Sequence, residues 1–305
     1  MKVTTVVVTY NRIELLKECL EALCNQDYDD MDILVVDNCS TDGTGEYLAS
    51  LKCSRSLRCI TMPSNIGGAG GFHEGMKAAL EGDCEYMWLM DDDTIPTKQA
   101  LSELVKAADV LKDEKFSYIS SNVYGMDHEC MNTPRMPFFQ SGKNGYADWN
   151  KHLDEALVKV RSATFCACFI SAKAARYVGL PIKEYFIWGD DTEYTMRLSK
   201  YYGQAYLAGK SLVLHKRANN QALSIVKEDN PGRIDMYYYY VRNYLNNLKL
   251  YFGVIFAIGK IGHFDLMILK ILFGKSRYKG KKIKVIFKGI FAFIFTSHKY
   301  KVDIK

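Results

Sequence analysis

Short apolar runs alternate with amphipathic stretches over the first hundred residues. The β-branched run 3–8 predicts a buried strand, and residues 13–24 after it carry Leu and Cys at helical spacing. Because strands and helices in this rhythm form parallel sheets with right-handed crossovers, we expect an α/β fold. The other expected strands are 33–36, 57–61 and 86–90, and the other expected helices run from Ser40 or Thr41 to about Leu51 and over 72–80.

The rest of the chain has an irregular middle and a tail that reads as helical from Ile234 onward. We therefore predict an α/β domain over residues 1–235 and a C-terminal basic amphipathic helical region over 236–305. The elements expected in the middle are helices over 98–111 and 192–202, strands over 165–171 and 211–214, and a functional loop over 124–150.

Composition places the chain among ordinary globular proteins. Hydrophobic residues make up 48% and charged residues 25% of 305, which excludes disordered, collagen-like and disulfide-scaffold chains. The nine cysteines include no Cys-x-x-Cys pair, so we expect reduced thiols and no zinc held by cysteine. Met1 and Lys2 lead directly into the first strand, and no apolar run reaches about 18 residues. Neither a signal peptide nor a membrane-spanning helix is expected.

Charge is divided unevenly along the chain. Residues 249–305 carry 13 Lys and Arg against 2 Asp and Glu, whereas the other 248 residues have a net charge of −6. A basic tail on an acidic body indicates an anionic partner, either nucleic acid or a membrane surface. No nucleic-acid-binding motif accompanies the charge, so we expect no nucleic acid.

The last apolar block of the tail has the pattern of a helix that lies in a membrane interface. A helical subdomain with solvated lysines is the alternative. Five apolar residues would share one helical face and three lysines would lie on another: Ile283, Ile286, Phe287, Ile290 and Ile294, against Lys281, Lys284 and Lys288.

Polar side chains follow the expected strands where they end, at the edge where open parallel sheets bind ligands. Asp91, Asp92 and Asp93 follow an apolar strand, where three carboxylates are costly unless a cation holds them. Mg²⁺ and Mn²⁺ favour such oxygen ligands, and Asp91 and Asp93 could share one ion while Asp92 faces elsewhere. A solvated acidic turn or helix cap is the alternative. The other strand-end residues are Thr9, Asn11, Arg12, Asp37 and Asn65.

Three further features are candidates for a role in ligand binding or catalysis. The glycine-rich segment 65–71 would let backbone approach a ligand before a helix N-terminus, or would form only a tight turn. The acidic residues of 188–194 lie beside Trp188 and suit sugar binding and general-base work, or capping of the next helix. His215 ends the strand expected over 211–214 and is a candidate ligand.

Taken together, these segments resemble family-2 glycosyltransferases with the GT-A fold, over roughly residues 1–250. One departure is Gly189, which stands between Trp188 and the acid pair that follows. The segments that carry the family resemblance are 7–12, 35–43 and 91–93, while 65–72, 188–194 and 238–243 are similar to the galactofuranosyltransferase branch, the last also to rhamnosyltransferases.

The resemblance implies a role for each residue. Asp91, Asp93 and His215 would hold a divalent cation, Mn²⁺ or Mg²⁺, at the diphosphate of a sugar nucleotide. Asp191 would be the general base that takes the proton of the acceptor hydroxyl in a single inverting displacement. The donor would be bound by Thr9, Asn11, Arg12, Asp37, Asn65, Gly68 and Asp92, and the acceptor by Trp188, Asp190 and Glu193.

The implied enzyme transfers galactofuranose from UDP-galactofuranose to a hydroxyl of a lipid-linked or cell-surface polysaccharide. The closest alternative uses dTDP-rhamnose or another hexose donor. Nucleotidyl transfer and a non-catalytic scaffold are more distant alternatives. The implied location is cytoplasmic and peripheral on the inner face of the cell membrane, which residues 249–305 would contact.

Overall fold

The computed structural model describes residues 1–137, 144–217, 222–296 and 302, and its contacts divide into two compact units. Of the described residues, 1–183 and 191–217 belong to the first unit. Residues 184–190 and those from 222 onward belong to the second unit. Each unit is described by itself, and the predicted pair of domains divided after residue 235 stays a prediction.

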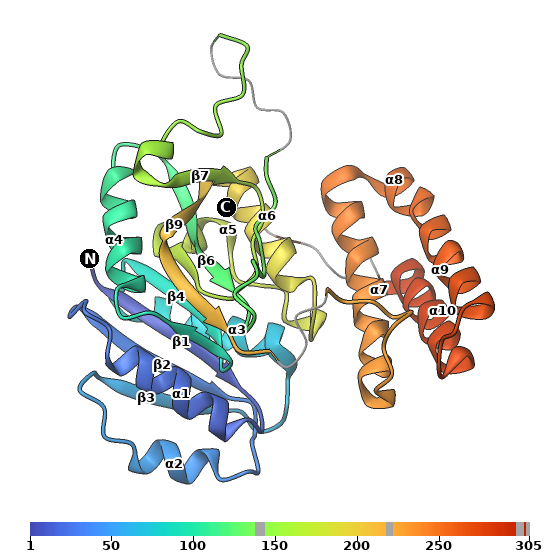
Figure 1. Ribbon diagram of the computed structural model, residues 1–305, viewed down its shortest axis with the longest axis horizontal. Coiled ribbons are helices and arrows are strands. Elements are labelled where there is room, and N and C mark those ends of the chain that lie inside the picture. Colours follow the sequence, from blue (N-terminus) through green and yellow to red (C-terminus); the bar gives the residue numbers. More distant parts are fainter. Residues whose placement is uncertain (138–143, 218–221, 297–301, 303–305) are drawn as a thin grey trace. The chain divides into compact units, whose positions relative to one another are not determined.

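A mixed sheet forms the centre of the first unit (Figure 1). Within the described ranges it has nine strands in the order β3-β2-β1-β4-β8-β6-β9-β5, with β7 paired to β9. The expected parallel pairing is confirmed for β1 with β2 and β4, and for β2 with β3, whereas β8 runs antiparallel to β4 and β6. The strands are β1 (Val3–Thr9), β2 (Met31–Asp37), β3 (Leu57–Thr61), β4 (Tyr86–Asp91), β5 (Thr94–Pro96), β6 (Phe116–Tyr124), β7 (Leu157–Val160), β8 (Cys168–Ser171) and β9 (Gln204–His215).

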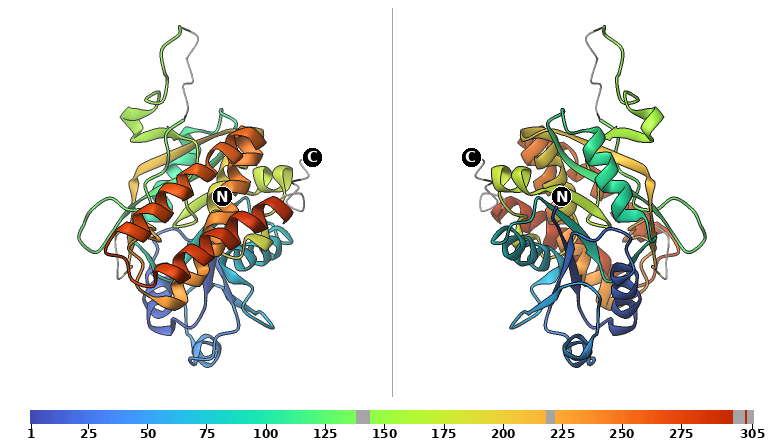
Figure 2. Two further views of the ribbon diagram at one scale, coloured as in Figure 1. Left: turned by 90° about the vertical axis from the view of Figure 1, so that its right-hand side faces the viewer. Right: turned by 90° about the vertical axis from the view of Figure 1, so that its left-hand side faces the viewer.

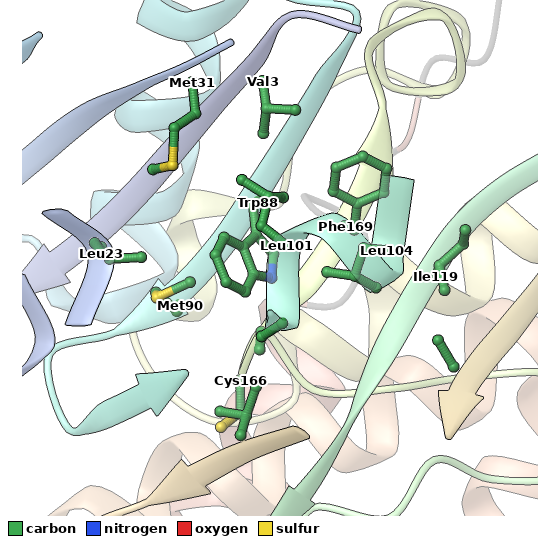
Figure 3. Packing of buried hydrophobic residues seen from close by; sticks show 14 of the residues in the cluster. Val3, Leu23, Met31, Trp88, Met90, Leu101, Leu104, Ile119, Cys166 and Phe169 are labelled. Atoms are coloured by element: carbon green, nitrogen blue, oxygen red, sulfur yellow. The ribbon is translucent and has the colours of Figure 1, made fainter. Parts of the chain in front are cut away.

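Apolar side chains cover both faces of this sheet. Along β1, Val3 and Val7 belong to one buried cluster, and Val6 and Val8 to another, as the twofold period of a strand requires. Figure 3 shows the first cluster, in which Trp88 lies among side chains from several strands and from α4. The helices of this unit are α1 (Ile13–Cys24), α2 (Thr44–Ser50), α3 (Gly67–Leu80), α4 (Ala100–Val110), α5 (Ala172–Val178) and α6 (Asp190–Tyr201).

The glycine-rich segment is a helix over most of its length, so the expected loop over 65–71 is wrong. Helix α3 begins at Gly67, and two of its glycines, Gly71 and Gly75, lie against the sheet. A Cβ atom on Gly71 would lie 2.5 Å from Val8 Cγ1, and one on Gly75 would lie 2.5 Å from Val6 Cγ1. The absence of side chains at these two positions therefore lets α3 pack closely on β1.

Replacing Gly75 with Ala should destabilise the protein by about 1–3 kcal/mol, the usual cost of overpacking a core. The new methyl would also lie 3.0 Å from Val36 Cγ2, so two strands would have to shift. Urea unfolding of the full chain measures the effect. Gly45→Ala in α2 is the matched control, because no atom lies within 4 Å of its Cβ, and it should be neutral or slightly stabilising. Equal unfolding midpoints for the two variants would contradict the prediction.

One pair of cysteines departs from the expected reduced state. Cys24, the last residue of α1, forms a disulfide with Cys53, which follows α2, across a Cα–Cα distance of 5.8 Å. The other seven cysteines are free. The two positions are 29 residues apart with no motif around them, so the pairing depends on how α1 and the segment after α2 pack.

The second unit is helical, as the tail pattern predicts. Helix α10 packs along α7, and α9 lies beside α10 (Figure 2). Asn230 caps α7 by accepting hydrogen bonds from the backbone N–H groups of Gly232 and Arg233. The helices are α7 (Pro231–Phe252), α8 (Val254–Gly259), α9 (Ile261–Phe273) and α10 (Lys279–Thr296).

The predicted apolar face of α10 is wrong in part, because this helix has two apolar faces. Ile286 and Ile290 are buried in a core formed with α7, whereas Phe287 and Ile294 are exposed. The sequence pattern had grouped the four on one face. In the part of the chain that the structure describes, no helix combines the length and the apolar character that crossing a membrane requires.

Candidate active site

The carboxyl ends of the parallel strands meet as expected. Thr9 lies opposite Asp37 in the pairing of β1 with β2, and Val8 lies opposite Asp91 in the pairing of β1 with β4. The last residue of β1, the last residue of β2 and the last residue of β4 therefore share one edge of the sheet.

Asp92 and Asp93 of the acidic triplet form a buried, hydrogen-bonded turn. The Thr9 hydroxyl donates to Asp92 Oδ2 at 2.8 Å, and Arg12 Nη1 donates to Asp92 Oδ1 at 3.3 Å and Asp93 Oδ2 at 2.9 Å. Asp92 and Asp93 follow the end of β4 as a turn rather than as extended chain. The expected alternation, with Asp92 facing away from Asp93, is therefore wrong, and one guanidinium contacts both carboxylates.

His215, the last residue of β9, completes this cluster. The residue pairs with Thr94 of β5, and its Nε2 lies 3.0 Å from Asp93 Oδ1. Its Nδ1 lies 2.7 Å from Asn132 Oδ1, and because an amide oxygen only accepts, Nδ1 is the donor of this hydrogen bond. The Asn132 amide nitrogen donates to Thr164 Oγ1 at 3.2 Å. Sequence reasoning missed Asn132, which lies in the expected loop over 124–150 and belongs to no motif.

Burial and pairing shift the ionisation of these groups strongly. Burial alone lowers the pKa of His215, but its hydrogen bonds and charge interactions with Asp93 and Cys166 together outweigh this and raise the pKa to about 10. Burial would raise the pKa of Asp93, yet the hydrogen bond from His215 and the charges of His215, Arg12 and Arg217 together lower it. Burial, helped by the charge of Asp93, raises the pKa of Asp91 to about 7, and burial raises that of Asp92 to about 6 despite Arg12.

The donor set of the cluster fits a divalent cation in part. A carboxylate oxygen and an imidazole nitrogen, as in Asp93 and His215, suit Mn²⁺. Within the described ranges, no group of three or more His, Cys, Asp or Glu side chains is arranged to hold a metal ion. A cation here would therefore need further ligands, which the oxygens of a diphosphate supply. Asp91 ends β4 beside this turn, and its role as a third protein ligand stays a prediction.

The other predicted donor-binding residues shape the loops at this edge. Asp37 is buried, and its Oδ1 accepts from the Ser40 backbone N–H at 3.0 Å. Asn11 Oδ1 accepts from the Thr41 backbone N–H at 2.7 Å. Asn65 Oδ1 accepts from the Gly67 N–H that begins α3, whereas a Cβ on Gly68 would meet open space.

The second acidic segment divides between the two units. Asp191 and Glu193 belong to the first unit, and Trp188 and Asp190 to the second. Asp191 lies in the first turn of α6, where its Oδ1 accepts from the Thr192 backbone N–H at 2.6 Å. The structure thus brings Thr9, Arg12 and His215 to Asp92 and Asp93, and it keeps Asp191 within the same unit.

Glu193 has a structural setting instead of the predicted acceptor contact. It is fully buried, and its two carboxylate oxygens accept from Arg197 Nε at 3.0 Å and Nη2 at 2.8 Å. Arg197 also donates to the carbonyls of Val178 and Leu180. This ion pair ties α6 to the end of α5, so we leave Glu193 out of the acceptor site.

Within the second unit, α7 holds the segment that carries Trp188. The Asn243 amide donates to the carbonyls of Tyr185, Ile187 and Trp188, and the Asn247 amide donates to that of Gly189. Gly189 has φ +92°, a left-handed conformation that L side chains rarely adopt. The glycine between the Trp and the acid pair therefore serves the turn that α7 stabilises.

Comparison with known families decides the class of protein. The family described as glycosyl transferase family 2 matches residues 4–168, which is more than half of the chain. The chain belongs to glycosyl transferase family 2. The resemblance of the strand-end motifs to this family is thus confirmed.

Curated relatives of the chain include a galactofuranosyltransferase. The chain is 28% identical over 207 residues to galactofuranosyltransferase GlfT1 of Mycolicibacterium smegmatis, an alignment over 64% of this chain and 65% of that one. The chain thus spans a little under two thirds of the length of this relative.

Solved structures share the fold at low sequence identity. TarS 1–349 of S. aureus, in complex with UDP-GlcNAc, has a TM-score of 0.56 at 15% identity, over all of this chain and 97% of that fragment. GalNAc-T7 with UDP, GalNAc and Mn²⁺ has a TM-score of 0.59 at 13% identity, over 82% of this chain and 48% of its own. This family-2 chain therefore has the GT-A α/β fold with a mostly parallel mixed sheet.

Proposed function

We propose that the protein is an inverting, metal-dependent galactofuranosyltransferase that uses UDP-galactofuranose. The observation that carries the proposal is the buried Asp93–His215 pair at the carboxyl edge of the sheet, 3.0 Å apart and beside Arg12. The likeness to GlfT1 supports galactofuranose as the donor sugar. A hydroxyl of a lipid-linked or cell-surface polysaccharide is the proposed acceptor.

Each group at the site has a part in this chemistry. Asp93 and His215 would hold the cation, which supplies positive charge to the leaving diphosphate when bound. Thr9 and Arg12 fix the carboxylates of Asp92 and Asp93, so the acidic turn keeps its shape when a donor binds. Asp37, Asn11, Asn65 and Gly68 line the proposed nucleotide pocket.

A single displacement follows. The acceptor oxygen attacks the anomeric carbon as the bond from that carbon to the diphosphate oxygen breaks, and the UDP leaves as an anion. The Asp191 carboxylate takes the proton of the attacking hydroxyl. Trp188 and Asp190 would bind the acceptor sugar, the first by stacking and the second by accepting a hydroxyl hydrogen.

The proposal also specifies the donor as UDP-galactofuranose, and dTDP-rhamnose is the second candidate donor. The test is release of free nucleotide from UDP-galactofuranose, UDP-galactopyranose, UDP-glucose and dTDP-rhamnose, each with a polyprenyl-diphosphate-linked glycan as acceptor and Mn²⁺ present. We expect turnover of UDP-galactofuranose alone, its loss in EDTA and its return with added Mn²⁺. Turnover of dTDP-rhamnose alone would contradict the donor, and full activity in EDTA would contradict the metal.

A lipid-linked acceptor would bring the enzyme to a membrane. We propose that the second unit binds an anionic membrane surface peripherally, on the cytoplasmic face where sugar nucleotides are found. The support is the exposed apolar side chains of α9 and α10 together with the basic charge of residues 249–305.

A further inference from the structure

We propose that Asn132 is a positioning residue, which holds the His215 imidazole so that Nε2 points to the metal position beside Asp93. The inference rests on the proposed function, because it concerns the same cation site. It assigns a role to a side chain outside every motif that connects this sequence to its family.

The contacts of Asn132 fix the direction of its amide. Its Oδ1 lies 2.7 Å from His215 Nδ1, while its Nδ2 donates to Thr164 Oγ1 at 3.2 Å. Because the nitrogen is engaged by Thr164, the oxygen is the atom presented to His215. An amide oxygen accepts only, so it selects the imidazole with a proton on Nδ1.

That choice leaves Nε2 as the nitrogen for a metal. Nε2 donates to Asp93 Oδ1 at 3.0 Å, so a cation bound here would take the place of the proton between these two atoms. Histidine ligands in metal sites commonly donate their other ring N–H to an oxygen, which fixes the ring and its tautomer. Asn132 supplies this second contact here, and His215 is only 4% exposed, so water does not replace it easily.

The backbone around Asn132 is built for this placement. The Met131 N–H donates to the Val123 carbonyl at 2.9 Å, which ties the loop back to β6 directly before Asn132. Asn132 itself has φ +51°, in the left-handed region that Asn tolerates better than most residues. Gln or Glu at this position would add strain, whereas Asp tolerates it as Asn does.

The positive φ also gives a clean way to remove the side chain. Asn132→Gly keeps a backbone that glycine adopts freely and deletes only the amide. Asn132→Asp keeps an oxygen that can accept from Nδ1. Asn150→Ala, at an exposed asparagine, is the control.

The measurement is the dissociation constant of Mn²⁺ for the full chain in the presence of UDP, followed by electron paramagnetic resonance of free Mn²⁺. Asn132→Gly should weaken Mn²⁺ binding about 10–100-fold, the usual effect of losing such a contact. Asn132→Asp should restore it to within about threefold, and Asn150→Ala should match the wild type. Binding of UDP without metal should stay unchanged in all three.

Three results would overturn the assignment. Wild-type Mn²⁺ affinity in Asn132→Gly would show that Asn132 does not position His215, and weakened binding in His215→Ala would then leave the proposed function standing. Equal weakening by Gly and Asp substitutions would show that only the packing of the loop matters. If the wild type and His215→Ala bind Mn²⁺ equally, the metal site itself fails and the role of Asn132 with it.

Discussion

Replacing Asp191 with Asn should abolish sugar transfer while leaving the binding of the UDP-sugar intact. The carboxylate lies in the first turn of α6, where Oδ1 accepts from the Thr192 N–H at 2.6 Å. An amide oxygen can keep that hydrogen bond, so the side chain should stay in place. The amide cannot accept the proton of the attacking hydroxyl, and loss of a general base typically lowers the rate about 10²–10⁴-fold.

Two measurements on each variant separate chemistry from binding. Transfer is followed by release of UDP in the presence of the acceptor, and donor binding by calorimetry of UDP with Mn²⁺. Asp109→Asn is the control, because Asp109 is an exposed carboxylate on α4. Activity in Asp191→Asn within threefold of the control would show that Asp191 is not the general base. Asp190 would then be the candidate for that role.

The acidic cluster at 190–193 shows why motif position alone does not assign a role. A pattern of Asp, Asp and Glu beside Trp188 indicates three polar contacts for a sugar. In the folded chain, Glu193 is one helical turn before Arg197, and the two form a buried pair with oxygen–nitrogen distances of 2.8 and 3.0 Å. The arginine four positions later was visible in the sequence, and the i to i+4 spacing could have identified the pair.

Some strands of the sheet can be predicted from the sequence and others cannot. Strands β1, β2 and β4 are buried on both faces, so their apolar runs are continuous and easy to recognise. Strand β6 is buried as well, yet it contains Ser120 and Ser121, and Ser121 Oγ is hydrogen-bonded to Ser211 Oγ at 2.8 Å. Polar residues satisfied inside a sheet break the apolar pattern, so no strand is predicted over the residues of β6.

Contacts between distant segments also could not be predicted from the sequence. Asn132 reaches His215 across 83 positions, and Cys24 reaches Cys53 across 29, without a motif around either partner. The two apolar faces of α10 posed a different difficulty, because a helix pattern shows which residues are apolar but not which of two apolar faces meets the core. Packing against α7 decides that one face is covered, and it leaves the other exposed.

That exposed face supports the second prediction with a large expected effect, which concerns membrane binding by α9 and α10. Phe287 and Phe291 of α10 are 56% and 62% exposed, and Phe273 at the end of α9 is 86% exposed. Lys284 and Lys288 are exposed among the phenylalanines of α10. Aromatic side chains with interspersed lysines suit the headgroup region of an anionic bilayer, where the rings enter the apolar layer and the lysines meet phosphates.

The double substitution Phe287→Ser with Phe291→Ser should weaken binding to vesicles of phosphatidylglycerol and phosphatidylcholine by about 100-fold or more. Each phenylalanine that leaves water contributes about 1.5–3 kcal/mol, and tenfold in affinity corresponds to about 1.4 kcal/mol. Cosedimentation of the full chain with vesicles measures the affinity. Because the two rings are exposed and outside the core with α7, the unfolding midpoint should not change.

The control and the charge dependence make the test specific. Tyr146→Ser removes another exposed aromatic side chain, 77% accessible and in the first unit, and should leave vesicle binding unchanged. Vesicles of phosphatidylcholine alone should bind the wild type much more weakly, since the lysines then find no net anionic surface. The wild type could instead fail to bind vesicles and form an oligomer that the double substitution dissociates. In that case the exposed face binds a second copy of the chain, and the proposed binding to a membrane surface is overturned.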